Sequence, residues 1–185
     1  MIETLRNNPR ARGLLLLVLV IAVVVIAIVL ISGGGGGGNG GGAVSPTIAS
    51  GDDLTKLAGD TGNTVYWAGN KPNTRTEFER TSDGNVYIRY LPPTGDPASQ
   101  RSRSLTIGSY PVGNAVAGLE VVAKRPGENT YTIHTVPGAI AVSSVDKPTS
   151  VYVAFPGSSV QVEVYDPNPA VALQTVLQGE IVPLR

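Results

Sequence analysis

The sequence lacks the residues on which most metal and redox chemistry depends. It contains no cysteine, and only one histidine, one tryptophan and one methionine among 185 residues. Without cysteine the chain forms neither a disulfide nor a thiolate site, so its fold must rest on a hydrophobic core. The single histidine, His134, has no second histidine with which to share a metal ion, and its alternating surroundings predict an ordinary strand residue. No metal or cofactor site is therefore predicted.

Charge of either sign is scarce as well. Charged residues make up 15% of the chain, and the formal net charge is zero. From Asp52 onward, 11 basic residues are set against 13 acidic ones. Because nucleic-acid binding requires a strongly basic surface, no nucleic-acid partner is expected.

One long apolar run stands out against this composition. Residues 14–31 form 18 consecutive apolar positions, the length at which a helix spans a bilayer. The segment before the run carries Arg6, Arg10 and Arg12. Because basic flanks stay in the cytoplasm, we predict a cytoplasmic N-terminus (1–12), a single-pass signal-anchor helix in the plasma membrane (13–32), and an exported remainder. A cleavable signal peptide is the alternative, but its apolar region is usually shorter and directly precedes the cleavage site.

Residues 33–49 follow the run and are rich in glycine. The glycines from residue 33 to 42 are interrupted only by Asn39, and no strand precedes them as a nucleotide-binding loop would require. Such a segment buries too little surface to fold and behaves as a tether with a reach of roughly 20–25 Å. The sequence thus predicts a globular domain at 50–185, held close to the outer surface of the membrane.

The ends of three short helices can be read within this domain. Ser50 resembles an N-cap, with Asp53 three residues later in the manner of a capping box, and Gly59 ends the first helix. Asn114 is a second N-cap. Asn168 is a third, followed by a proline at the first helical position.

Between these helices the apolar pattern repeats every two residues. Strands are predicted at 65–68, 76–81, 85–91, 105–109, 130–136, 139–145, 150–155 and 160–165. Short turns containing glycine or proline join many of these segments, as in hairpins. The expected fold class is therefore α+β: a small, mainly antiparallel sheet with about three short helices packed on one face.

Three segments also resemble a known group of proteins. The sequence reads Val-Tyr-Trp-Ala-Gly at 65–69, Val-Tyr-Ile-Arg-Tyr-Leu-Pro at 86–92 and Val-Glu-Val-Tyr-Asp-Pro at 162–167. These segments resemble uncharacterised single-pass membrane-anchored proteins of actinobacterial (high-GC Gram-positive) type. The resemblance covers most of residues 50–185 and implies the same order of anchor, linker and small envelope-facing domain. It carries no functional residues across.

Catalytic motifs are weak in this sequence. Asp60, Thr61 and Gly62 spell the aspartic-protease triplet, but a turn after a helix explains them more simply. The sequence holds no second copy, so a protease would need a dimer to supply the second carboxylate. Ser144 and Lys147 match the serine–lysine spacing of penicillin-recognising enzymes, yet they end a strand rather than open a helix. A small envelope hydrolase would have to draw on scattered carboxylates.

Aromatic residues are few, at 5% of the chain, and most fall in or beside predicted strands. Because such rings combine apolar area with a polar tip, a shared face of tyrosines would bind a glycan or an extended peptide. The candidate ligand-binding residues are Tyr66, Trp67, Tyr87 and Tyr152.

The functional expectation is a membrane-tethered binding domain without catalytic activity, whose partners are the lipid bilayer, through 13–32, and an envelope protein or wall glycan. Two alternatives remain at this point. One is a hydrolase using carboxylates such as Asp60, Asp83 and Asp146, and the other is a domain that self-associates through a strand edge.

Overall fold

The computed structural model describes residues 42–184. The predicted cytoplasmic segment and membrane helix, together with most of the predicted linker, lie outside the described residues. Within residues 42–184, no helix has the length and apolar character needed to cross a bilayer.

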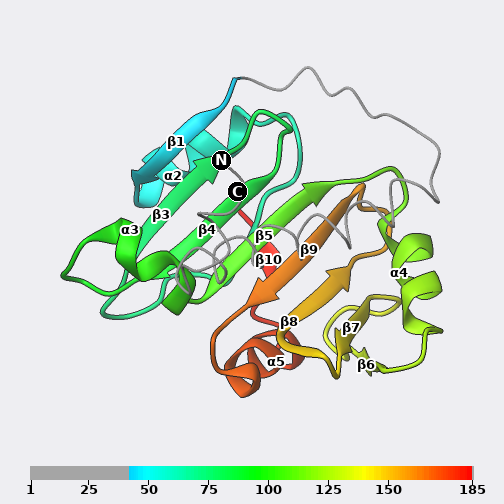
Figure 1. Cartoon of the computed structure of the whole chain (residues 1–185). Coiled ribbons are helices and arrows are strands. Elements are labelled where there is room, and N and C mark those ends of the chain that lie inside the picture. Colours follow the sequence, from blue (N-terminus) through cyan, green and yellow to red (C-terminus); the bar gives the residue numbers. More distant parts are fainter. Residues whose placement is uncertain (1–41, 185) are drawn as a thin grey trace, which may run out of the picture.

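An eight-stranded antiparallel sheet organises the domain (Figure 1). Its strands follow the spatial order β1-β3-β4-β5-β9-β8-β7-β6, and every neighbouring pair is antiparallel. The strands are β1 (Val44–Ile48), β3 (Arg75–Arg80), β4 (Val86–Leu91), β5 (Thr106–Pro111), β6 (Glu128–Thr132), β7 (Ile140–Ser144), β8 (Lys147–Ala154) and β9 (Val160–Tyr165). A separate two-stranded sheet pairs β2 (Tyr66–Trp67) with β10 (Val182–Pro183). The α+β class and the antiparallel sheet predicted from the sequence are confirmed.

Four short α-helices accompany the sheets in the described part of the chain. They are α2 (Gly51–Gly59), α3 (Pro97–Gln100), α4 (Ala115–Ala123) and α5 (Pro169–Leu177), and a 3-10 turn, η2 (Arg101–Arg103), continues α3. The Asn114 side chain accepts a hydrogen bond from the amide of Ala117, and Asn168 accepts one from Ala170, as caps do. The three helices expected from the sequence are confirmed, although Ser50 makes no side-chain capping bond to α2.

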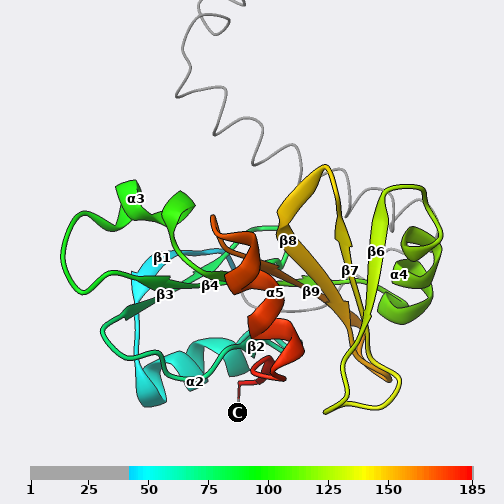
Figure 2. The same ribbon diagram turned by 90° about the horizontal axis from the view of Figure 1, so that it is seen from below.

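The two faces of the large sheet are covered differently (Figure 2). The inner face packs against α2, α5 and the two-stranded sheet, and this contact forms the larger core, which includes Phe78, Ile88, Val162 and Val176. On the outer face, α4 covers the β6–β8 end through a smaller core around Leu119 and Val142. The α3–η2 segment lies on the outer side at the β3–β4 end. A polar region of the outer face lies between α4 and the α3–η2 segment.

The structure corrects four predictions made from the sequence. The folded domain begins before residue 50, because Val44–Ile48 pairs with β3 although it was assigned to the linker. The sequence does not reveal this strand, because it is short and contains Pro46. Helix α3 is an element that the sequence pattern does not predict, although it begins with an Asp-Pro pair. Strand β6 ends at Thr132, so His134 lies exposed in a turn rather than in a strand. Helices cover both faces of the sheet rather than one.

Candidate functional site

A polar band crosses the outer face of the sheet, perpendicular to its strands. The strand register places Glu77, Arg89, Thr106, Tyr165 and Ser150 in one cross-strand row. A second row runs beside it through Glu79, Tyr87, Gly108, Glu163 and Tyr152. Side chains at alternate positions share a face, so these ten residues form one continuous layer on the outer face of the sheet, much of it buried.

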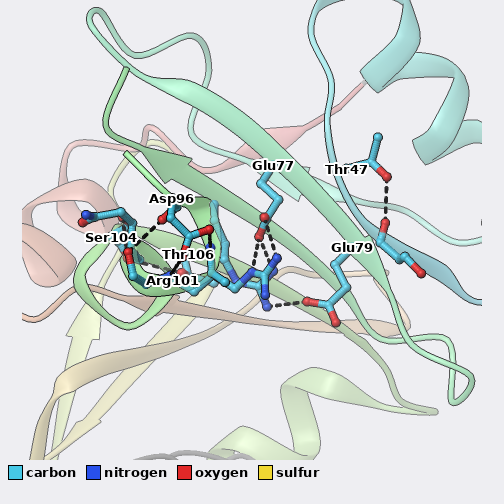
Figure 3. Close-up of polar contacts among 12 residues, drawn as sticks. Thr47, Glu77, Glu79, Asp96, Arg101, Ser104 and Thr106 are labelled. Atoms are coloured by element: carbon cyan, nitrogen blue, oxygen red, sulfur yellow. Dashed lines mark hydrogen bonds and ion pairs between the residues drawn. The ribbon is translucent and has the colours of Figure 1, made fainter. Parts of the chain in front are cut away.

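At one end of the band, a buried carboxylate holds two arginines (Figure 3). Glu77 is 1% exposed. Its Oε1 lies 2.9 Å from Arg89 Nη1 and 2.9 Å from Arg101 Nε, and its Oε2 lies 3.0 Å from Arg101 Nη2. Arg89 also reaches Glu79, at 2.6 Å. The contact with Glu77 raises the pKa of Arg101 further. This arrangement satisfies the buried charge and ties the α3–η2 segment to the sheet.

Local structure explains how Arg101 reaches the sheet. The Asp96 side chain accepts hydrogen bonds from the amides of Ala98 and Ser99 and so caps α3. The chain then tightens into η2, whose first residue is Arg101. The hydroxyl of Ser104 donates to the carbonyl of Gln100 and closes the segment. The segment from Asp96 to Ser104 is therefore ordered locally, and Arg101 is bound to the Glu77 carboxylate.

In the middle of the band, Glu163 is a second buried carboxylate, held by hydroxyl groups. It accepts hydrogen bonds from Tyr110 Oη at 2.5 Å, Ser150 Oγ at 2.7 Å and Tyr152 Oη at 3.2 Å. The Tyr110 ring also meets the Tyr87 ring edge to face, with 5.9 Å between centroids. Because each carboxylate oxygen of Glu163 accepts at least one hydrogen bond, the side chain is held in place by the hydroxyl groups around it.

Burial of these phenols makes the folded domain sensitive to alkaline pH. Burial, together with the nearby Glu163 carboxylate, raises the pKa of Tyr110 and of Tyr152 well above the usual value near 10. The phenols stay protonated in the native state, whereas they ionise near pH 10 in the unfolded chain. The native state then holds more protons, so the contribution of these groups to stability is complete below about pH 10 and is lost as the pH rises further.

We therefore expect Tyr152→Phe to flatten the alkaline loss of stability. Between pH 10 and pH 11, the free energy of unfolding should fall less steeply in this variant, by up to about 1.4 kcal/mol per pH unit. Urea unfolding at a series of pH values, followed by the fluorescence of the single tryptophan, measures both slopes. Parallel curves for the two chains would show that this phenol ionises alike in the folded and unfolded states.

A hollow of about 680 Å³ opens elsewhere, beside the turn between β8 and β9. Hydrogen-bonding groups on its wall come from backbone, hydroxyl and amide atoms. The lining residues are Thr55, Ala58, Gly59, Gly62, Asn63, Thr64, Val65, Tyr66, Pro156, Gly157, Ser158, Pro183 and Leu184. No lysine, arginine, aspartate, glutamate or histidine is among them. The hollow is therefore suited to an uncharged polar ligand.

Tyr66 fixes one wall of this hollow. Its ring stacks on Phe155, with centroids 4.8 Å apart and planes inclined by 11°. Its hydroxyl donates to Ser158 Oγ at 3.2 Å, and its amide donates to Ser109 Oγ at 3.0 Å. These contacts join β2 to the β8–β9 turn and to β5, so the wall is formed before any ligand arrives.

The four candidate binding residues therefore do not share one surface. Tyr87 and Tyr152 belong to the polar band on the outer face, whereas Tyr66 and Trp67 lie in β2, which pairs with β10 on the inner side. Tyr66 is the one that lines the hollow. Tyr152 is 7% exposed, and its hydroxyl is committed to Glu163. Tyr66 is also buried, at 5% exposed, and its hydroxyl is bonded to Ser158, so it forms part of the wall of the hollow.

Of the carboxylates considered for hydrolysis, Asp146 lies apart from Asp60 and Asp83, since the Asp60 carbonyl contacts Arg80 at the β3–β4 end. Asp60 follows the end of α2. Asp83 lies in the β3–β4 turn, and Asp146 lies in the β7–β8 turn, at the opposite end of the strands. All three are exposed, and the described residues contain no cluster of three or more histidine, aspartate or glutamate side chains able to hold a metal ion. The geometry does not bring these carboxylates into one cleft.

Sequence reasoning missed Glu163 and the residues of the β8–β9 turn. Glu163 alternates with valines in β9, as a solvent-facing residue would, and nothing local indicates that three hydroxyl groups surround it. Pro156, Gly157 and Ser158 have the composition of any tight turn. No family model, curated protein or solved structure matches the chain, so the site is argued from geometry alone.

Proposed function

We propose that this chain is a membrane-tethered, extracytoplasmic binding domain that holds a neutral sugar in the hollow beside the β8–β9 turn. The observation that carries this proposal is the uncharged, hydroxyl- and amide-bearing wall of that hollow. Sugars are recognised by such hydrogen-bonding groups together with apolar ring faces, which the exposed Pro156 and the half-buried Pro183 offer here.

The same lining favours binding over catalysis. General acid–base hydrolysis needs a titratable pair within reach of the reacting bond. Among the described residues of the lining, Tyr66 alone carries an ionisable side chain, and its hydroxyl is hydrogen-bonded to Ser158. A hydrolase would require the exposed carboxylates Asp60, Asp83 or Asp146, none of which lines the hollow.

The position of the hollow supports the proposed tether. Val44, the first residue of β1, pairs with Arg80 at the last position of β3. The β8–β9 turn lies at this same end, because Val86, Ser109 and Val162 are cross-strand neighbours there. The hollow thus lies at the end of the sheet where β1 begins. If residues 13–32 span the membrane, as proposed from their hydropathy, the hollow is held near the bilayer.

A leucine at Gly59 should block the hollow while leaving the fold intact. Gly59 lines the hollow and ends α2, and a β-carbon placed on it meets no atom within 4 Å. We expect Gly59→Leu to weaken binding of a neutral disaccharide of N-acetylglucosamine at least about 10-fold, equivalent to about 1.4 kcal/mol. Titration calorimetry of the full chain in lipid nanodiscs measures the dissociation constant.

Gly42→Leu is the matched control, because Gly42 also has open space around its β-carbon and does not line the hollow. It should bind as the unmodified chain does. If no neutral sugar or peptidoglycan fragment binds the unmodified chain, the proposed function is wrong. Equal affinity of the Gly59→Leu and Gly42→Leu variants would place the ligand elsewhere.

A further inference from the structure

A second hollow lies on the other side of the β8–β9 turn. It measures about 390 Å³ and is bounded by Gly113, Asn114 and Val116 at the start of α4 and by residues 156–159 of the turn. Pro156, Gly157 and Ser158 line both hollows. The turn is therefore a low ridge with a hollow on each side.

The ridge is fixed by its own hydrogen bonds. The amide of Ser158 donates to the carbonyl of Phe155 at 3.1 Å, and the amide of Val160 donates to Ser158 Oγ at 3.1 Å. The amide of Val112 donates to the carbonyl of Ser159 at 2.7 Å, which joins the turn to the chain leading into α4. A site preformed in this way loses little conformational entropy when a ligand binds.

The two hollows have the same chemistry. Among the described residues, the second one, like the first, is lined by no acidic or basic side chain. Its polar groups that can meet a ligand are the side-chain NH2 of Asn114, the hydroxyl of Ser159 and backbone atoms, because the Ser158 hydroxyl is already bonded to Tyr66 and Val160. The second hollow therefore suits the same chemical class of ligand, but at about 390 Å³ against about 680 Å³ it holds less of it than the first. A polymer of repeating neutral units satisfies both at once.

We infer that the ligand is an oligosaccharide of several neutral sugar units, which crosses the β8–β9 turn and places units in both hollows. This inference rests on the proposed function, because it assumes that the first hollow binds sugar. It adds that recognition depends on length. A short sugar occupies the larger hollow, whereas a longer chain gains the second hollow without new ordering of the protein.

The test uses chitin oligosaccharides of two to six N-acetylglucosamine units as neutral probes of the full chain in nanodiscs. Gly113→Leu blocks the second hollow, since a β-carbon on Gly113 meets no atom within 4 Å and Gly113 lines that hollow. We expect this variant to bind the disaccharide like the unmodified chain and the hexasaccharide at least about 10-fold more weakly. Gly59→Leu should weaken both.

The outcomes separate the two proposals. If Gly59→Leu loses binding while Gly113→Leu binds the hexasaccharide normally, the first hollow stands as the sugar site and the two-hollow inference is overturned. If the unmodified chain binds no oligomer of any length, both proposals fail. Parallel titrations with isolated peptidoglycan strands and with vesicles containing a neutral glycolipid distinguish a wall glycan from a lipid headgroup as the source of the sugar.

Discussion

Glu77→Ala is expected to destabilise the domain by about 3–5 kcal/mol, the usual cost of removing one partner from a buried ion pair. Arg89 would lose the carboxylate on one side, and its side chain is only 12% exposed, so water cannot replace the lost contact. Arg101 would lose both of its hydrogen bonds to the sheet. Urea unfolding, followed by the fluorescence of the single tryptophan, measures the change.

Arg101→Ala provides an informative comparison with this variant. The Arg101 side chain is 34% exposed, and Glu77 keeps Arg89 when Arg101 is removed. Its loss should cost about 1 kcal/mol, within the range of a solvent-screened pair. Glu120→Ala, at an exposed position of α4, should change stability by no more than about 0.5 kcal/mol. If Glu77→Ala is as mild as Glu120→Ala, the pair does not stabilise the sheet.

Gly108→Ala is expected to be the second severe substitution, although it adds a single methyl group. A β-carbon at position 108 would lie 2.5 Å from Tyr110 Oη and 2.7 Å from its ring carbon Cζ. Tyr110 is 1% exposed and bonded to Glu163, so its ring has no free space into which to move. Overpacking costs about 1–3 kcal/mol, and losing a hydrogen bond to a charged group costs about 1.5–3 kcal/mol. We expect a loss of roughly 3–5 kcal/mol in the free energy of unfolding.

A double-mutant cycle tests directly whether the clash with the Tyr110 ring causes this loss of stability. When Tyr110 has been replaced by alanine, the added methyl group meets no ring, so Gly108→Ala should cost less than about 1 kcal/mol in that background. Gly59→Ala is the control for glycine itself, because its β-carbon meets no atom within 4 Å. An unchanged cost of Gly108→Ala in the two backgrounds would rule out the clash with Tyr110.

Helix ends and alternating strands were predicted well because their causes are local. Asn114 and Asn168 cap the helices that follow them through their own side chains, within three residues of chain. The alternation of valines with polar residues in β9 likewise depends on the geometry of one strand. Ser50 shows the limit of this reasoning, because its helix forms without the predicted capping bond.

The band and the hollows depend instead on residues far apart in the chain. Tyr110 and Glu163 are 53 residues apart, and Tyr66 and Ser158 are 92 apart. A local pattern indicates that a side chain lies on one face of a strand, but it does not indicate which strand lies beside it. The order β5-β9-β8 brings Tyr110, Glu163 and Tyr152 together, and it places β9 beside β5 although three strands separate them along the chain.

The sequence by itself determined the fold class, the ends of three helices and the absence of cysteine chemistry, and it predicts the membrane anchor from hydropathy. Each of these follows from composition or from contacts within a few residues. Only the tertiary structure decided which polar residues are buried together, how the tyrosines divide between the two sides of the sheet, and where the hollows lie. The physical reason is that burial and cavity shape arise when distant strands pair, and the free energy that selects this pairing belongs to the whole core.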